Sequence, residues 1–268
     1  MNRIDSTLSE LKTRHKKMLS PYITAGDPSP DKTVSLMHTL VEAGSDIIEL
    51  GIPFSDPMAE GPVIQRAMER ALQHQVCCDD VFTMVEQFRQ QDQKTPIILM
   101  GYVNPIEIYG YERFAQRAQA AGVDGTIVVD MPPEESDNVL SIWKKHHLQA
   151  IYLCSPTTSE ERMTRINACA SGYLYYVSLK GVTGSELDIK SLQTLYQQRK
   201  LQTSLPLMVG FGIKTPEMAA KVAAFADGVI VGAALIEQIE QAVSAGTNMN
   251  EAAFSCINAM RKAIDNQR

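Results

Sequence analysis

Residues 46–73 of the chain read DIIELGIPFSDPMAEGPVIQRAMERALQ, and this stretch contains one complete β-α unit. Residues 46–50 (DIIEL) form a short apolar run, which is typical of a strand buried on both faces. A proline-containing loop follows, and over residues 62–73 apolar side chains recur at spacings of three and four, as in a helix that packs one face on a core. The stretch therefore predicts a strand, a loop and a helix in succession.

The same alternation continues along the chain. Seven further short apolar runs match this strand, at residues 22–24, 96–100, 125–130, 150–154, 173–178, 207–211 and 228–232. Helical spacing recurs at residues 31–43, 111–121, 134–146, 160–170, 187–198, 215–224 and 233–243. Apolar strands of this kind are typical of a parallel sheet, and eight β-α units in about 250 residues match a closed (β/α)8 TIM barrel. We therefore predict an α/β fold of this type.

The prediction places residues 1–268 in a single domain, because no composition break or long linker divides the chain. Extra helices are expected at the start (5–15), after the second unit (78–91) and at the end (250–265). The competing architecture is a doubly wound open sheet, which usually carries a G-x-G-x-x-G turn after its first strand. Here that position reads TAGDP (residues 24–28), which favours the barrel.

Composition narrows the possible partners. Of 268 residues, 44% are apolar, and 25 Lys and Arg against 31 Asp and Glu give a formal net charge of -6 without a basic patch. Nucleic acid and membrane surfaces are therefore not expected partners. The charged residues 1–17 contain no secretory signal, and no apolar run approaches the roughly 18 residues of a membrane span, so we expect a cytoplasmic location. The five cysteines lack zinc spacing and are expected to be buried thiols, and no metal site is predicted.

Carboxylates stand at the predicted mouth of the barrel, where catalytic groups of such folds lie. Glu49 interrupts an apolar strand, and its burial is costly unless it has a partner or a raised pKa. A structural ion pair is the alternative to a functional role. The following loop carries Asp56 and Glu60 on a proline-rich backbone, and two carboxyls in different surroundings can serve as acid and base.

Glycine-containing segments follow the last three predicted strands. Residues 178–185 contain two glycines and small polar side chains, and we interpret them as a mobile lid, with a connection of no function as the alternative. Gly210-Phe211-Gly212 and Gly232-Ala233 follow strands seven and eight, the recurrent phosphate site of these barrels. With the carboxylates, these features predict carbon–carbon or carbon–proton chemistry on a sugar phosphate.

Six motifs occur in order along nearly the whole chain, at residues 21–28 (PYITAGDP), 49–57 (ELGIPFSDP), 102–105 (YVNP), 130–135 (DMPPEE), 181–184 (GVTG) and 210–213 (GFGI). This combination closely resembles the tryptophan synthase alpha chain family. The resemblance implies retro-aldol cleavage of indole-3-glycerol phosphate to indole and glyceraldehyde 3-phosphate, in the last steps of L-tryptophan biosynthesis. It implies no cofactor in this chain and a beta chain that carries pyridoxal phosphate, receives the indole through a tunnel and completes an α2β2 tetramer. Two stiff loops, at residues 53–57 and at Asn104, are the surface that we expect to contact the beta chain.

The resemblance also assigns roles to residues. Glu49 would move protons between the glycerol hydroxyl and the indole C3 carbon, because the carbon–carbon bond breaks readily only after C3 is protonated. Glu60 would accept the indole N–H and stabilise the positive charge that grows on the ring. The other substrate-binding residues would surround or close over the indole (Tyr22, Tyr102, Tyr175, Thr183 and Phe211) or hold the phosphate through backbone N–H groups (Gly184, Gly212, Gly232 and Ala233).

Four positions depart from the residues usual in the family. Glu60 stands where Asp is usual, which lengthens the side chain by one methylene, and Tyr22 stands where Phe is usual, so its hydroxyl needs a hydrogen-bond partner. Leu179 replaces an Arg of the lid, and Ala233 replaces a Ser, so a hydroxyl contact with phosphate is lost. We expect the activity to be present and lower than is typical. Two alternatives stay open: an alpha chain that only activates its beta partner, and another phosphate-binding barrel enzyme such as a sugar-phosphate isomerase.

Overall fold

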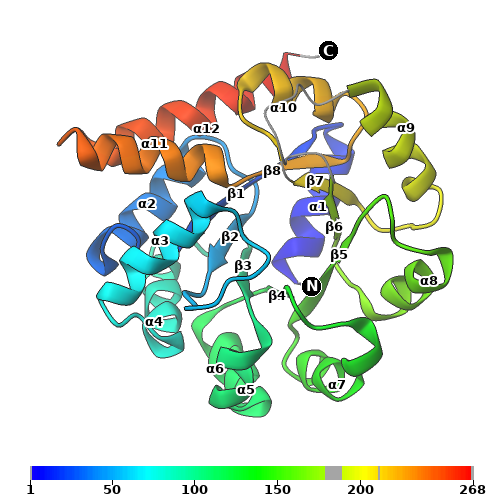
Figure 1. Cartoon of the computed structure of the whole chain (residues 1–268), viewed down its shortest axis with the longest axis horizontal. Coiled ribbons are helices and arrows are strands. Elements are labelled where there is room, and N and C mark those ends of the chain that lie inside the picture. Colours follow the sequence, from blue (N-terminus) through cyan, green and yellow to red (C-terminus); the bar gives the residue numbers. More distant parts are fainter. Residues whose placement is uncertain (1, 179–188, 211, 267–268) are drawn as a thin grey trace.

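Eight parallel strands close into a barrel in a computed structural model, which describes residues 2–178, 189–210 and 212–266 (Figure 1). The strands are β1 (Met18–Thr24), β2 (Ile48–Gly51), β3 (Ile97–Gly101), β4 (Gly125–Val128), β5 (Gln149–Cys154), β6 (Leu174–Val177), β7 (Leu207–Gly210) and β8 (Gly228–Val231). Each strand pairs with the next along the chain, and β8 pairs with β1, so the sheet has no open edge. The barrel prediction is confirmed, and the open-sheet alternative is wrong.

Helices follow the strands and surround the barrel (Figure 1). Those of the predicted units are α2 (Pro30–Glu42), α3 (Pro62–Gln73), α6 (Tyr111–Ala121), α7 (Asp137–Lys145), α8 (Glu160–Cys169), α9 (Ile189–Lys200), α10 (Pro216–Ala223) and α11 (Ala233–Ser244). The three predicted extra helices are present as α1 (Arg3–Thr13), α4 (Cys78–Arg89) and α12 (Met249–Asp265). Within the described ranges, no helix combines the length and the apolar character needed to cross a membrane.

Two helical segments differ from the sequence prediction. The structure adds α5 (Val103–Tyr109), where Asn104 and Pro105 suggest a loop. Pro105 falls in the first turn of this helix, where a missing N–H breaks no intrahelical bond. The helix expected at 134–146 begins later than predicted, because a short 3-10 turn, η1 (Pro133–Glu135), precedes α7.

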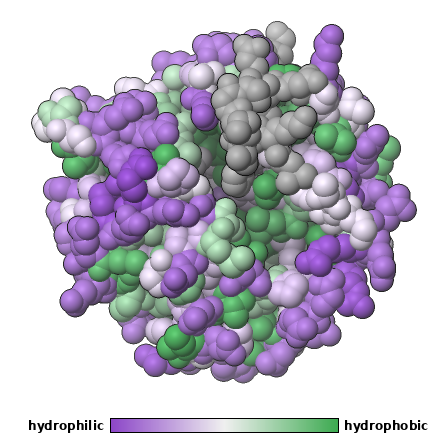
Figure 2. Space-filling view, in the orientation of Figure 1, coloured by the Kyte–Doolittle hydropathy of each residue, from purple (hydrophilic) through white to green (hydrophobic). Residues whose placement is uncertain are grey.

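Side chains that alternate along the strands form two separate cores. The outward residues pack under the helices, and the inward residues fill the barrel. Ile4 and Leu11 of α1 belong to the inner set, so α1 covers the end at which the strands begin (Figure 1). On the face shown in Figure 2, hydrophobic residues lie near the centre, inside a rim of mostly hydrophilic residues. The buried members of the inner set are Ile4, Leu11, Met18, Tyr22, Ile47, Ile98, Met100, Ile127, Ile151, Tyr173, Tyr175, Met208 and Ile230.

Candidate active site

Glu49 of β2 is completely buried, in register with Tyr22 of β1 and Ile98 of β3. Tyr173 donates a hydrogen bond to Oε1 of Glu49 at 2.6 Å, and the Ser20 hydroxyl lies 3.4 Å from the same oxygen. Among the described residues, Oε2 has no hydrogen-bond partner, and no basic side chain pairs with the carboxylate. Within residues 2–178, 189–210 and 212–266, the alternative of a structural ion pair is therefore not supported, and Oε2 is left for a ligand.

Burial changes the proton affinity of both predicted carboxylates. It raises the pKa of Glu49 to about 8, and the hydrogen bonds from Tyr173 and Ser20 oppose this only in part. The charge of Glu60 raises the pKa of Glu49 further. Burial also raises the pKa of Glu60, to about 7. Near neutral pH, Glu49 therefore holds a proton that it can give, while Glu60 changes its charge in the same range.

Glu60 lies near the end of the loop between β2 and α3. Hydrogen bonds hold the backbone of this loop at Glu60 and at its neighbour Ala59. The Ala59 amide donates to the Tyr102 hydroxyl at 3.2 Å, and the Gln65 side chain donates to the Glu60 carbonyl oxygen at 2.8 Å. The Glu60 amide donates to the Pro57 carbonyl at 3.0 Å and closes a turn. The end of β3 and the first turns of α3 thus fix the point from which the carboxylate extends.

Two tyrosine rings occupy the interior because glycines face them. A Cβ on Gly51 would lie 2.6 Å from Cζ of Tyr22, and one on Gly210 would overlap the ring of Tyr175. Any larger residue at either glycine would displace its ring. The hydroxyl of Tyr22 finds a partner in Thr24, whose Oγ1 lies 3.2 Å away. The additional hydroxyl at position 22 is therefore accommodated within the pocket.

The predicted phosphate position lies at the start of α11. Gly232 is the N-cap of this helix, and first-turn amides such as that of Ala233 have no acceptor inside a helix and face an anion readily. A Cβ on Gly232 would lie 3.6 Å from Cδ1 of Ile64 and 3.6 Å from Cβ of Tyr22. Gly212 has a φ of +79°, which glycine adopts without strain. A helix N-terminus preceded by a glycine and lying beside Tyr22 has the character of an anion-binding position next to an aromatic ring.

The structure brings most of the predicted site together. Glu49 and the tyrosines at positions 22, 102 and 175 lie near enough to Glu60 for its charge to raise the pKa of each of them. Four predicted positions lie outside the described residues, namely Leu179, Thr183, Gly184 and Phe211.

Sequence reasoning missed three residues that hold the carboxylates in place. Ser20 and Tyr173 contact Glu49, and each lies two residues before a predicted site tyrosine, Tyr22 or Tyr175. Because residues two apart in a strand share a face, this alternation could have identified both. Gln65 gives no such signal, since its hydrogen bond to the Glu60 carbonyl depends on the path of the loop.

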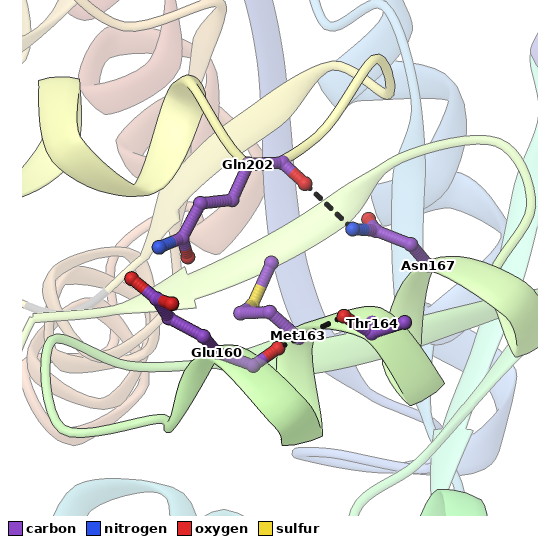
Figure 3. Close-up of a pocket in the computed structure, with 5 residues that line it drawn as sticks. All are labelled: Glu160, Met163, Thr164, Asn167 and Gln202. Atoms are coloured by element: carbon purple, nitrogen blue, oxygen red, sulfur yellow. Dashed lines mark hydrogen bonds between the residues drawn. The ribbon is translucent and has the colours of Figure 1, made fainter.

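A cavity of about 330 Å³ lies outside the barrel, between α8 and the segment after α9 (Figure 3). In its wall, Asn167 donates to the Gln202 carbonyl at 2.6 Å. Within α8, Thr164 donates to the Glu160 carbonyl at 3.0 Å. Met163 completes the lining, and no predicted site residue takes part. This cavity is separate from the candidate site.

The five cysteines lie apart from the candidate site. All five are free, and no three Cys, His, Asp or Glu side chains in the described part of the chain are grouped to hold a metal ion. The expectation of buried thiols holds for Cys78 and Cys154, but Cys169 and Cys256 are only partly buried. Cys77 is exposed, because it is the N-cap of α4 and its thiol donates to Asp80.

Comparison with known proteins identifies the family. A family model described as tryptophan synthase alpha chain matches residues 8–265. The tryptophan synthase alpha chain of Legionella pneumophila strain Philadelphia 1 is 68% identical over 267 residues, covering 99% of this chain and 98% of the relative, and that of Marinobacter nauticus is 50% identical with the same coverage. The crystal structure of the alpha subunit from L. pneumophila strain Paris matches with a TM-score of 0.96 and 65% identity over 99% of both chains. A crystal structure of tryptophan synthase from M. tuberculosis matches with a TM-score of 0.87 and 29% identity, covering 98% of this chain and 99% of that one. The chain belongs to the tryptophan synthase alpha chain family.

Proposed function

We propose that the chain cleaves indole-3-glycerol phosphate to indole and glyceraldehyde 3-phosphate, with Glu49 as the proton-transferring group. The observation that carries this proposal is Glu49 itself, buried within β2, with a pKa of about 8 and one carboxylate oxygen that has no hydrogen-bond partner among the described residues. A group that gives and then takes a proton works best when its pKa lies near the working pH. Family membership supports the reaction and overturns the sugar-phosphate isomerase alternative.

Glu49 begins the proposed reaction in its protonated form. It gives the proton to C3 of the indole ring, which becomes a cation that can accept the electron pair of the carbon–carbon bond. The resulting carboxylate takes the proton of the glycerol hydroxyl on the neighbouring carbon, whose C–O bond becomes a carbonyl as the carbon–carbon bond breaks. The electron pair returns to the ring, indole and the aldehyde form, and Glu49 is protonated again. The cycle needs no other proton donor.

Glu60 acts as an anion in this scheme. Its carboxylate would accept the ring N–H and stabilise the positive charge that forms when C3 is protonated. Tyr102 and Gln65 hold the loop that carries it, so the charge is placed before the substrate arrives. Because burial raises the pKa of Glu60 to about 7, the charged form is present at and above neutral pH.

The remaining site residues would bind and enclose the substrate. Ala233 offers a backbone N–H but no hydroxyl to the phosphate, a loss of roughly 1 kcal/mol per missing hydrogen bond, which supports a lower activity than is typical. The tyrosines would face the indole ring, and the glycines would let the backbone approach the phosphate. The full proposed set is Tyr22, Tyr102 and Tyr175 around the ring, Gly212, Gly232 and Ala233 on the phosphate, and, from the resemblance, Thr183, Gly184 and Phe211.

A beta chain is the partner in this proposal, in an α2β2 assembly. Alpha chains of the family carry no cofactor, and the pyridoxal phosphate of the complete enzyme belongs to the beta chain. The proposal treats residues 1–268 as one domain, since strands that form a single barrel span residues 18–231. It places the protein in the cytoplasm as a biosynthetic enzyme.

The beta chain would dock where the strands end. A groove of about 400 Å³ lies beside α4 and α5, and its apolar wall includes Ile52, Pro53, Pro105 and Ile108. Ile108 is 83% exposed, and Met58 in the neighbouring loop is 84% exposed. Exposed apolar side chains around a groove are typical of protein interfaces. Of the polar and proline contacts predicted from the sequence, Asp56 and Pro57 belong to the loop that carries Met58, and Asn104 lies in the first turn of α5.

Glu49→Gln tests the proposed function. An amide fills the same space but cannot exchange a proton, so indole release should fall about 100-fold or more while thermal unfolding stays close to that of the wild type. Retention of more than about a tenth of the rate would remove Glu49 from this role. The assay is run with and without the beta chain, because a wild type that releases no indole but accelerates its partner would favour the activator alternative.

A further inference from the structure

Arg70 of α3 joins three elements at the end of the barrel where the candidate site lies. Its guanidinium donates two parallel hydrogen bonds to Asp27, from Nε to Oδ1 at 2.6 Å and from Nη2 to Oδ2 at 3.0 Å. A third hydrogen bond runs from Nη1 to Oε1 of Glu240 at 2.8 Å. Asp27 lies in the buried loop after β1, and Glu240 lies on α11. We call Asp27, Arg70 and Glu240 the clamp.

Each element that the clamp joins carries part of the candidate site. β1 ends two residues after Tyr22, α3 begins two residues after Glu60, and α11 begins directly after Gly232. The start of α3 lies only about 12 Å along the helix axis from Arg70, a distance over which an α-helix is stiff. Fixing α3 at Arg70 therefore also fixes the end of the loop that carries Glu60.

The three parts also approach one another at the site. Ile64 in the first turn of α3 and Tyr22 in β1 both lie 3.6 Å from the position of a Cβ on Gly232. A rotation of α3 against α11 would therefore change both this contact and the distance from Glu60 to the first amides of α11.

The clamp is geometrically stricter than an ordinary surface ion pair. A planar guanidinium that gives parallel N–H groups to a carboxylate fixes an angle as well as a distance. Burial raises the pKa of Asp27, and the hydrogen bond and charge of Arg70 oppose that rise, so the arginine favours the charged carboxylate. Arg66, one turn earlier, donates to both oxygens of Glu240 at 2.9 and 2.7 Å, and its hydrogen bonds in the described part of the chain go to Glu240 alone. Of these two arginines, Arg70 is the one that connects all three elements.

We propose that Arg70 is a positioning residue for the lyase reaction, and that through the clamp it sets the distance between Glu60 and the phosphate-binding amides of α11. This inference rests on the proposed function. A substrate held by its phosphate at one end and by its ring N–H at the other needs these two points at a fixed separation, and a misplacement near 1 Å can lower a rate about 100-fold. Binding of the phosphate alone needs only the amides. Loss of the clamp should therefore lower kcat more than it raises KM.

The test compares Arg70→Lys with Arg66→Lys in the full chain assembled with its beta chain. Lysine keeps a positive charge beside the buried Asp27, so the variant should fold, but one ammonium group cannot reproduce the planar pair of N–H groups and also reach Glu240. We expect kcat for indole release to fall about tenfold in Arg70→Lys, with KM within about threefold of the wild type. Arg66→Lys is the matched control. The Arg66 side chain is 47% exposed and has no hydrogen bond to Asp27, so both parameters should stay within about twofold.

Thermal unfolding of both variants shows whether they are folded at the assay temperature. A wild-type kcat in folded Arg70→Lys, or an equal fall in Arg66→Lys, would overturn the positioning role and leave the clamp as a structural feature. A wild-type protein that releases no indole would refute the proposed function and this inference with it. An active wild type with an unchanged Arg70→Lys variant would refute this inference alone.

Discussion

Tyr173 and Glu49 are 124 residues apart in the chain, and the Tyr173 hydroxyl lies 2.6 Å from a Glu49 carboxylate oxygen inside the barrel. The hydrogen bond favours the charged form of Glu49 and lowers its pKa against the larger effect of burial. Tyr173 itself keeps its proton, because burial and the neighbouring carboxylate raise its pKa well above the ordinary value. This pair therefore influences the pH at which Glu49 exchanges its proton.

We expect Tyr173→Phe to move the alkaline limb of the pH profile of kcat/KM to higher pH. Glu49 must begin protonated, so activity is lost as the pH rises through its pKa of about 8, and removal of a hydrogen bond that lowers this pKa shifts the limb upward. The acid limb belongs to Glu60, which must be ionised, and should stay near its pKa of about 7. An alkaline limb that stays in place or moves to lower pH would contradict the assignment.

Glu60→Gln and Glu60→Asp separate the charge of this side chain from its length. Glu60→Gln should lose most of the rate of indole release, because an amide offers no negative charge to the developing cation. Glu60→Asp keeps the charge, and we expect the rate to change by only a small factor. Steady-state kinetics with indole-3-glycerol phosphate provide the measurement.

Two other results at Glu60 would change the interpretation. A rise of about tenfold in the rate of Glu60→Asp would show that the longer side chain is misaligned. Such a rise corresponds to about 1.4 kcal/mol of recovered transition-state stabilisation. Equal rates of indole release by the wild type and Glu60→Gln would be incompatible with any charge-stabilising role of Glu60.

Ile108→Asp should weaken association with the beta chain by about tenfold or more, because it places a charge in the exposed apolar groove beside α5. Leu201→Asp is the matched control. Leu201 is 89% exposed, but it precedes β7 and so lies at the opposite end of the barrel. Titration of the beta chain with each variant, followed by gel filtration, measures the effect. Equal binding of both variants would place the interface elsewhere.

Gly51→Ala should destabilise the protein by about 1–3 kcal/mol, because the added methyl group would meet the ring of Tyr22. Combining it with Tyr22→Phe should recover part of this loss, since the hydroxyl is one of the atoms in the way. Gly61→Ala is the control, because its methyl group would enter open space at a negative φ. Denaturant unfolding measures all three free energies. A loss in Gly51→Ala no larger than that in Gly61→Ala would mean that the ring can move freely.

Most of the fold could be predicted because the same physical pattern repeats eight times. A buried parallel strand followed by an amphipathic helix leaves a strong signal in the order of apolar residues. The elements that the sequence did not predict correctly contain prolines. β1 begins at Met18, although Pro21 interrupts the apolar run, because Met18, Leu19 and Ser20 pair with β8. In the same way, Pro105 made residues 103–109 resemble a loop, although they form α5.

A site residue could be predicted where its position in a strand is enough to identify it. Glu49 is such a residue, since a carboxylate that interrupts an apolar strand stands out, and the mouth of a barrel is where catalytic groups lie. Its contact with Tyr173 could not be read in the same way, because it joins β2 to β6 only when the barrel closes. The clamp escaped prediction for a similar reason, since Asp27, Arg70 and Glu240 become neighbours only through the packing of α3 against α11.

The helix that precedes the first strand determines where the product leaves. Ile4 and Leu11 of α1 belong to the core inside the barrel, so among the described residues α1 closes the end where the strands begin. A neutral apolar molecule formed beside Glu49 would then leave past the loops at the other end, where the groove at α4 and α5 also lies. A partner docked over that end would receive the product directly.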